Sequence, residues 1–195
     1  MMKFKESLRK TIHLSSLIIP LGYRYVLNYN RNLMFSIMLV VFILMLVVEF
    51  YRLWQKSFRK TFWLIFGMVL RHKELYDFTG ATYLFFSSVI CIAFFPPEVT
   101  FFALCFLSLG DTSAALVGLN LGKRKYKNSN KTLEGSLACF IVCFVFALCF
   151  KADPVIALIG ALGATLAEAS RIRIDDNIKI PFLSAILMTL AGIFI

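Results

Sequence analysis

Long apolar blocks separated by short polar stretches dominate the pattern of this chain. A helix needs about 20 mostly apolar residues, within a range of roughly 17 to 25, to cross a bilayer. About seven blocks approach or reach that length, so we expect each to form a membrane-spanning helix. They are Ile12–Leu27, Leu33–Tyr51, Ala81–Pro96, Thr100–Leu121, Gly135–Phe150, Pro154–Ser170 and Pro181–Ile195. The pattern predicts an all-α, polytopic transmembrane helical bundle that forms one integral-membrane domain over residues 1–195.

The composition supports this interpretation. Of the 195 residues, 59% are hydrophobic and only 16% are charged, whereas a soluble domain has about 25% charged residues. The polar stretches are short loops, so no separate soluble domain is expected. No small-residue cleavage site follows the first apolar block, which we therefore interpret as a retained span. The five cysteines fall inside expected spans, where cysteine usually behaves as a small hydrophobic residue.

The basic residues predict the orientation of the chain in the membrane. With the N-terminus in the cytoplasm, all of the 21 Lys and Arg residues except Arg24, Arg31 and Lys151 lie on the cytoplasmic side. Basic residues in short loops favour that side. Orientation and attraction to anionic lipids explain the net charge of +10, so no nucleic-acid partner is needed. If the protein is bacterial, the predicted location is the inner membrane.

One mixed segment, Lys56–Lys73, interrupts the succession of spans. Its apolar residues are too few to cross a bilayer, so an amphipathic helix lying in the cytoplasmic interface between spans two and three is expected. This helix is either an anchor or a platform that guides a lipid substrate, and the sequence favours neither. Glu49 and Glu74 are expected to pair with Arg52 and Lys73.

Carboxylates from separate regions converge at the cytoplasmic ends of the expected spans. Such residues at membrane depth are costly, so they are candidates for function. They are Asp111 in the fourth span, Glu134 at the start of the fifth, Glu168 at the end of the sixth, and Asp175 and Asp176 in the following loop. This convergence predicts a polar site on the cytoplasmic face.

Basic residues beside these carboxylates suggest a phosphate site. A helix N-terminus binds phosphate through free N–H groups, and Lys131-Thr132-Leu133-Glu134-Gly135-Ser136 opens the fifth span, with Lys123 and Arg124 nearby. The glycine spacing is not that of a Walker A loop. Mg²⁺ prefers one or two carboxylates plus substrate phosphate oxygens. The block therefore predicts an enzyme that uses a nucleotide at the membrane surface and takes its second substrate from the bilayer.

Several motifs in the same order resemble those of a known family. They are Arg9-Lys10-x-x-His13, Gly110-Asp111-x-x-Ala114-Ala115-x-x-Gly118-x-x-x-Gly122-Lys123, Lys131-Thr132-x-Glu134-Gly135-Ser136, Ala167-Glu168-Ala169 and Asp175-Asp176-Asn177 followed by Pro181. The sequence resembles the dolichol kinase, phytol kinase and eukaryotic-type diacylglycerol kinase family of CTP-dependent lipid kinases. It is distantly similar to phosphatidate cytidylyltransferase, but it lacks the His-Gly-Gly and Asp-Arg-x-Asp elements of that family. The Asp-Asp-Asn ending favours a kinase.

The resemblance implies transfer of a phosphoryl group from CTP, or another nucleoside triphosphate, to a polyprenol, phytol-like alcohol or diacylglycerol, with Mg²⁺ as cofactor. The catalytic half then spans residues of about 100–181. The implied catalytic residues are Asp111, Lys131, Glu134 and Asp176. The implied nucleotide and phosphate ligands are Lys123, Arg124, Lys131, Thr132, Gly135, Ser136 and Asn177. The implied metal ligands are Asp111, Glu168 and Asp176, and further candidates are Arg9, Lys10, His13 and Asp175.

Alternatives remain at this point. His13 is as well explained as a packed histidine as by a contact with phosphate or carboxylate. The chain could be a cytidylyltransferase that makes a CDP-lipid. A lipid or ion transporter is disfavoured, because its charges should follow the membrane depth rather than gather at one surface. A homo-oligomer remains open.

Overall fold

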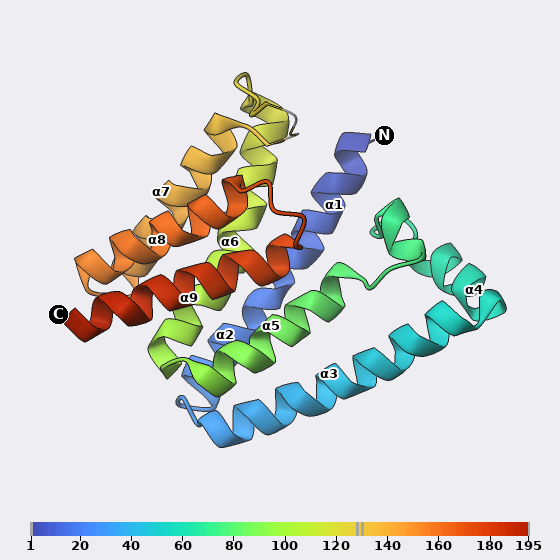
Figure 1. Ribbon diagram of the computed structural model, residues 1–195, viewed down its shortest axis with the longest axis horizontal. Helices are drawn as coiled ribbons and strands as arrows, with labels where there is room; N and C mark the ends of the chain where they lie inside the picture. Colours follow the sequence, from blue (N-terminus) through green and yellow to red (C-terminus); the bar gives the residue numbers. More distant parts are fainter. Residues whose placement is uncertain (1, 128, 130, 195) are drawn as a thin grey trace.

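The computed structural model describes residues 2–127, 129 and 131–194, and over these residues helices joined by loops make up the regular structure (Figure 1). The α-helices are α1 (Met2–Leu14), α2 (Ile18–Leu21), α3 (Arg31–Trp54), α4 (Lys56–Phe66), α5 (Gly80–Phe94), α6 (Pro97–Leu121), α7 (Leu133–Cys149), α8 (Pro154–Ala169) and α9 (Asp176–Phe194). Two 3-10 segments, Ser15–Leu17 and His72–Leu75, and a π-helical segment, Gly22–Val26, complete the elements. The all-α fold class is confirmed.

The helices agree with the expected spans in place but differ in length. By length and composition, α3, α6 and the stretch Asp176–Ile193 of α9 can cross a membrane, whereas α5, α7 and α8 are shorter apolar helices. The helical segment of the first expected span starts earlier than predicted. It includes α1, in which basic residues precede the apolar block without interrupting the helix. Likewise, α9 begins at Asp176 and contains Pro181 inside the helix rather than at its start.

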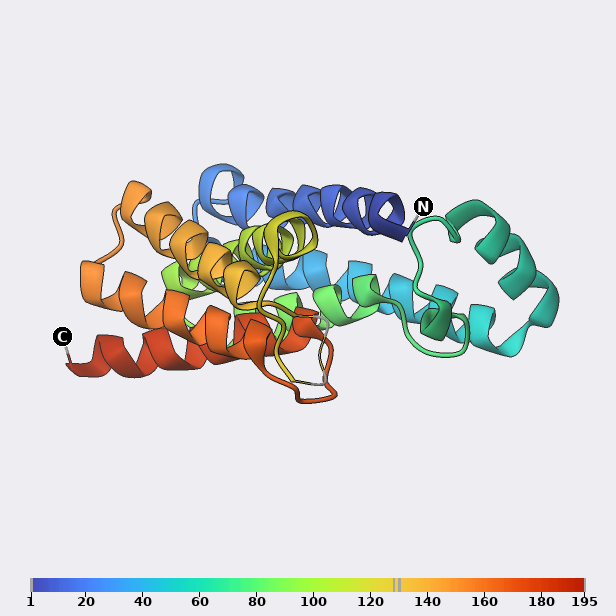
Figure 2. The ribbon, with the colours of Figure 1, turned by 90° about the horizontal axis from the view of Figure 1, so that it is seen from above.

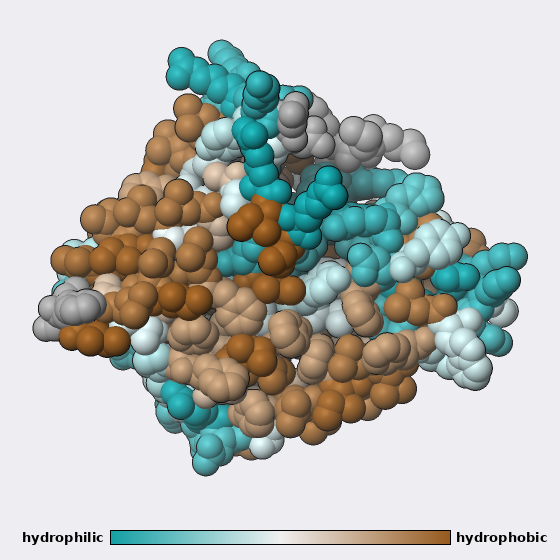
Figure 3. Space-filling model, in the orientation of Figure 1, coloured by the Kyte–Doolittle hydropathy of each residue, from teal (hydrophilic) through white to brown (hydrophobic). Residues whose placement is uncertain are grey.

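Hydrophilic side chains are distributed unequally between the two ends of the bundle. The N-terminus, α4, the α6–α7 loop and the α8–α9 loop lie toward one end, and the C-terminus, the α7–α8 connection and the α2–α3 connection lie toward the other (Figures 1 and 2). Hydrophilic side chains cover both ends, most extensively the end with the α6–α7 loop and α4, and an apolar band lies between them (Figure 3). This distribution suits a bundle that crosses a bilayer along that direction.

The core is built around α6, which packs against α1, α7, α8 and α9. Phe101, Cys105 and Phe106 of α6 are fully buried. A Cβ atom on Gly110 would lie 2.8 Å from the sulfur of Cys143 and 2.9 Å from that of Cys139. Small residues therefore allow α6 and α7 to approach closely, as is typical of packing between membrane helices. The cysteines at this contact are free thiols that fill space, as the sequence predicts.

A buried ion pair holds the connection between α4 and α5 against α3. The Arg52 guanidinium pairs with Glu49 and donates hydrogen bonds of 2.7 Å to the carbonyls of Glu74 and Asp77. The Thr79 hydroxyl donates to the other carboxylate oxygen of Glu49 at 2.7 Å. Removing one partner of a buried pair costs roughly 3–5 kcal/mol, so this cluster fixes the path of residues 70–79. The predicted Glu49–Arg52 pair is confirmed.

The expected Glu74–Lys73 pair is wrong. The Glu74 carboxylate is buried and instead accepts a 3.0 Å hydrogen bond from the backbone N–H of Arg71, which caps the 3-10 segment. The Lys73 ammonium instead approaches Asp175 at 4.0 Å. This turn places basic side chains next to the start of α9.

Candidate active site

Lys131 is the centre of an ion cluster between three helices. It precedes Thr132, which caps α7, so its side chain reaches the last turn of α8 and the first turn of α9. The Lys131 ammonium lies 3.0 and 3.1 Å from the two carboxylate oxygens of Asp176, and 3.8 Å from the nearer oxygen of Glu168. It also donates to the backbone carbonyl of Glu168. The structure thus brings together three of the predicted residues from separate regions.

Further polar contacts orient the two carboxylates of this cluster. Ser136, one turn into α7, donates a 2.8 Å hydrogen bond to the second oxygen of Glu168, and both side chains are buried. Lys179 lies one turn after Asp176 in α9 and forms a 2.8 Å ion pair with it. Lys179 also reaches the Ser170 hydroxyl at 3.2 Å. Asp176 therefore lies between two ammonium groups, and with Glu168 the cluster contains two cations and two carboxylates.

A basic cleft of about 380 Å³ opens beside the ion cluster. Its cationic lining residues come from the α4–α5 connection, the start of α7 and the α8–α9 loop, and they are Arg71, Lys73, Lys131, Arg171, Arg173 and Lys179. Among the described residues that line the cleft, the acidic ones are Asp175 and Asp176. Cations in such excess around a concave surface favour a ligand with several negative charges, such as a triphosphate.

Arg71 and Lys73 are residues that the sequence did not assign to the site. The Arg71 guanidinium pairs with Asp175 at 3.1 Å, and the Asp175 side chain is only 6% exposed. Burial lowers the pKa of Arg71, but the carboxylates of Asp175, Glu74 and Asp111 outweigh burial and hold its pKa above the ordinary value. Arg171, Arg173 and Lys179 were likewise counted only as topology signals. The available clue was that basic residues flank Asp175 and Asp176 on both sides.

A second polar cluster joins α1 to α6. Lys10 pairs with Asp111, and Nε2 of His13 lies 3.6 Å from the same carboxylate. The three side chains are almost fully enclosed, although His13 Nε2 makes no hydrogen bond. The sequence placed Asp111 with the other carboxylates, whereas in the structure it is neutralised by the basic residues of α1. Lys10 and His13 therefore belong to the Asp111 cluster.

Arg9 precedes Lys10 in α1 and lies near Asp111 and Arg71. It pairs with Glu6 on α1. Burial and the nearby Arg71 lower the pKa of Arg9, while Glu6 and Asp111 oppose that shift. The proximity of Arg9 to both Arg71 and Asp111 extends the positive potential of the cleft toward α1.

The predicted phosphate cradle at the start of α7 is occupied by contacts within the protein. Thr132 is buried, and its hydroxyl accepts a 3.1 Å hydrogen bond from the N–H of Gly135. A Cβ atom on Gly135 would lie 2.6 Å from the carbonyl oxygen of Ala114, so this glycine permits close helix packing. Ser136 is engaged by Glu168. The structure gives these three residues capping and packing contacts, and phosphate binding by them stays a prediction.

Lys123, Arg124 and Glu134 lie at the two ends of the α6–α7 loop, near the protein surface. The backbone N–H of Glu134 at the start of α7 lowers the pKa of the Glu134 carboxylate, and so does the 3.2 Å hydrogen bond that this carboxylate accepts from the backbone N–H of Arg124. None of the three lines the basic cleft. Their expected roles with the nucleotide stay predictions, and the loop that they close positions Lys131.

Asn177 orients one of the acidic residues that line the basic cleft. Its side-chain amide and its backbone N–H both donate to Asp175, at 2.7 and 3.1 Å. A Cβ atom on Gly80, at the start of α5, would lie 3.2 Å from the Asn177 amide nitrogen. Asn177 therefore orients Asp175 at the α5–α9 contact, and its predicted contact with a nucleotide stays a prediction.

The predicted metal ligands do not form a preassembled set. Within residues 2–127, 129 and 131–194, no three His, Cys, Asp or Glu side chains gather closely enough to hold a metal. Asp111 pairs with Lys10, and Asp176 and Glu168 contact Lys131. Mg²⁺ needs only one or two carboxylates when phosphate oxygens supply other ligands, so Asp176 with Glu168 fits an ion that arrives with a nucleotide. The metal assignment stays a prediction.

Comparisons with known proteins find sequences that are similar to this chain. No protein-family model and no solved structure matches the chain. CTP-dependent diacylglycerol kinase 1 of Saccharomyces cerevisiae is 28% identical over 92% of this chain and 71% of the yeast protein. The protein of that name from Eremothecium gossypii is 30% identical over 77% of this chain and 56% of its own length. An uncharacterized Rickettsia prowazekii protein is 26% identical over 90% of this chain and 89% of its own length. Over most of its length, the chain is thus similar to proteins named CTP-dependent diacylglycerol kinase.

Proposed function

We propose that the protein is a membrane lipid kinase that transfers the γ-phosphoryl group of CTP to the hydroxyl of diacylglycerol. The observation that carries the proposal is the basic cleft around Lys131 and Asp176, which lies at a polar end of an apolar helical bundle. The names of the fungal relatives support CTP as donor and diacylglycerol as acceptor. Another nucleoside triphosphate, or a polyprenol or phytol-like alcohol, would be compatible with the same cleft and the same apolar helices.

The nucleotide triphosphate would lie in the cleft. Lys131 and Lys179 neutralise Asp176, and Arg71, Lys73, Arg171 and Arg173 surround the phosphates. Phosphoryl transfer depends mainly on positioning and on neutralising charge on the phosphate oxygens. Asp176 and the Glu168 carbonyl hold the Lys131 ammonium in place. Among these cations, Lys131 is therefore the one that we expect to stabilise the negative charge that develops on the leaving oxygen.

The acceptor hydroxyl would approach from the α1–α6 side. There, Asp111 orients the hydroxyl and accepts its proton as the oxygen bonds to the γ-phosphorus and CDP departs. Lys10 and His13 hold the Asp111 carboxylate in place. In this reaction the bond between the γ-phosphorus and its bridging oxygen breaks, and the products are a phosphorylated lipid and CDP.

Mg²⁺, when bound, would neutralise phosphate oxygens, and Asp176 with Glu168 would hold it. Both carboxylates lie beside the cleft, and Glu168 is already oriented by Ser136. The basic residues of the cleft and of the N-terminal helix favour a cytoplasmic position for this end of the bundle, where CTP is available.

The experiment that tests the proposal is a matrix of the four common nucleoside triphosphates against diacylglycerol, a polyprenol and a phytol-like alcohol, using the purified protein in mixed micelles. We expect CTP and diacylglycerol to give the fastest formation of lipid phosphate, and we expect chelation of divalent cations to stop it. Absence of lipid phosphate in every combination, from protein that elutes as a single folded species, would overturn the proposal.

A further inference from the structure

A second cleft lies at the outer surface of α4, away from the basic cleft of the candidate active site. It measures about 420 Å³ and runs between α4 and the turn that ends the 3-10 segment His72–Leu75. Its basic lining residues are Lys56 and, about one turn later on the same face of α4, Arg59 and Lys60. Trp63 and Tyr76 are among its apolar lining residues. We call this the α4 groove.

The cations of the α4 groove have no acidic partners. Over the part of the chain that the structure describes, no Asp or Glu lines the groove, and Lys56, Arg59 and Lys60 form no ion pair. The Arg59 guanidinium instead lies 4.9 Å from the centre of the Tyr76 ring, a cation–π contact that fixes its position across the groove. Three uncompensated cations around a small concave surface favour an anionic group such as a phosphate.

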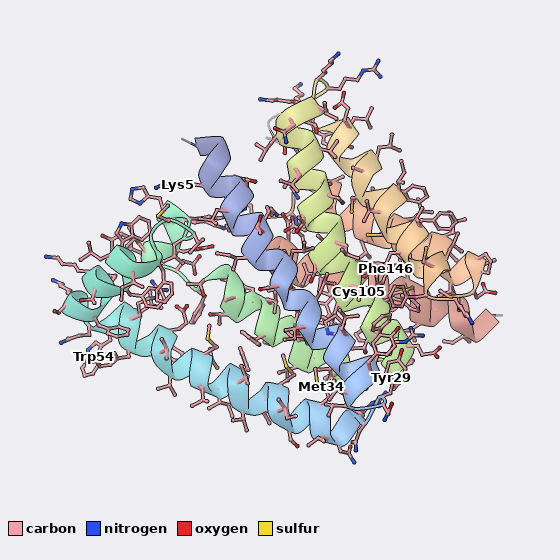
Figure 4. The ribbon with its side chains drawn as sticks, turned by 180° about the vertical axis from the view of Figure 1, so that it is seen from behind. Lys5, Tyr29, Met34, Trp54, Cys105 and Phe146 are labelled. Atoms are coloured by element: carbon pink, nitrogen blue, oxygen red, sulfur yellow. The ribbon has the colours of Figure 1, made fainter. Side chains whose placement is uncertain are left out.

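The apolar surroundings of the groove place it at a membrane surface. Trp54 and Leu64 are 83% and 85% exposed, and Ile65 is 66% exposed. Figure 4 shows Trp54 at the corner between α3 and α4, directed away from the bundle. Trp and Tyr side chains are enriched at the depth of the lipid headgroups, and a helix with one basic and one apolar face lies in that layer. The groove would therefore meet headgroups rather than free solutes.

We propose that the α4 groove binds the phosphate of an anionic bilayer phospholipid. The neutral acceptor alcohol offers no negative charge to Lys56, Arg59 and Lys60, so this lipid is distinct from the substrate and the site goes beyond the proposed function. Leu75 and Tyr76 line the groove, and they follow closely in sequence after Arg71 and Lys73, which line the basic cleft. A headgroup bound to Arg59 and Tyr76 thus rests against the segment that completes the nucleotide site.

Tryptophan fluorescence provides a direct test, because the chain has only Trp54 and Trp63. In a Trp54→Phe background, Trp63 is the sole reporter, and it lines the groove. The protein would be placed in phosphatidylcholine nanodiscs that contain a small fraction of brominated phosphatidylglycerol or, separately, of brominated phosphatidylcholine. We expect clearly stronger quenching by the anionic lipid, because it is enriched at the groove above its bulk fraction.

The double variant Arg59→Gln/Lys60→Gln should lower quenching by brominated phosphatidylglycerol to the level of the neutral lipid. The matched control Lys125→Gln/Lys127→Gln removes the same charge from the exposed α6–α7 loop and should leave the excess quenching unchanged. Equal quenching by the two lipids in the parent, or an unaltered excess in the Arg59/Lys60 variant, would overturn the proposal.

One further arm separates a lipid site from a site for free phosphate. Inorganic phosphate at constant ionic strength should not displace the lipid; full displacement would mean a phosphate-ion site and overturn the proposal. The readout needs no turnover, so failure of the kinase assay and failure of lipid binding are distinguishable.

Discussion

Replacing Lys131 by Met is the most informative perturbation of the candidate active site. The change keeps the length and apolar stem of the side chain but removes the ammonium that contacts Asp176 at 3.0 and 3.1 Å. Lys179 still pairs with Asp176 at 2.8 Å, so that carboxylate keeps one cation. What is lost is the positive charge between Asp176 and Glu168, so the cluster keeps two carboxylates and one cation.

The size of the effect follows from the exposure of these groups. The Lys131 and Asp176 side chains are 24% and 21% exposed, so their environment lies between bulk water and the protein interior. A unit charge pair about 4 Å apart is worth roughly 1 kcal/mol in water and roughly 4 kcal/mol at an effective dielectric constant of about 20. If Lys131 neutralises charge that develops on phosphate, its loss should lower kcat/KM by roughly 10- to 1000-fold.

The assay is initial-rate formation of lipid phosphate from CTP and diacylglycerol in mixed micelles. Lys131→Arg, which keeps the charge, should retain more activity than Lys131→Met. Lys123→Met is the matched control, because Lys123 is close in sequence and was also predicted to bind phosphate, but it lies outside the basic cleft. The reasoning is refuted if Lys131→Met retains full kcat/KM, or if Lys123→Met loses as much activity.

Three further predictions address other parts of the molecule. Asp111→Asn should lower kcat by roughly 100- to 10,000-fold if the carboxylate accepts the hydroxyl proton, with normal membrane insertion and elution in detergent; full turnover would exclude that role. Arg71→Gln should raise the KM for CTP by about tenfold, the equivalent of one charge-assisted contact of about 1.4 kcal/mol, and an unchanged KM would remove Arg71 from the nucleotide site. Gly135→Ala should destabilise the fold by roughly 1–3 kcal/mol because its Cβ atom meets the Ala114 carbonyl, whereas Gly22→Ala, with nothing within 4 Å, should not; thermal unfolding in detergent compares the two.

The hydrophobic pattern predicted the helices well, because every apolar block must satisfy its own backbone hydrogen bonds in a bilayer. It placed the boundaries less well. The pattern could not show that α1 starts at Met2, because basic residues such as Lys10 interrupt the apolar pattern without breaking the helix. Nor could it show that α9 starts before Pro181, since proline is tolerated where neighbouring helices satisfy the freed backbone groups.

The site was predicted in part. The sequence identified Lys131, Glu168 and Asp176 because lysine and carboxylates are conspicuous at the ends of apolar helices. It did not identify Arg71, because that residue joins the cleft only through the contact of the α4–α5 connection with the start of α9, which involves residues about a hundred positions apart. It also treated Asp111 as part of one carboxylate group, because no local signal indicates that α1 supplies its partner.

The kinase assignment is tested most directly by following two labels of CTP through one reaction. With diacylglycerol as acceptor, we predict that radiolabel in the γ-phosphate enters the lipid extract and that label in the α-phosphate remains in soluble CDP. In a parallel reaction with phosphatidate as acceptor, label from the α-phosphate in the lipid together with release of the γ-label as pyrophosphate, and no γ-label in lipid from the diacylglycerol reaction, would contradict the assignment and identify a cytidylyltransferase instead.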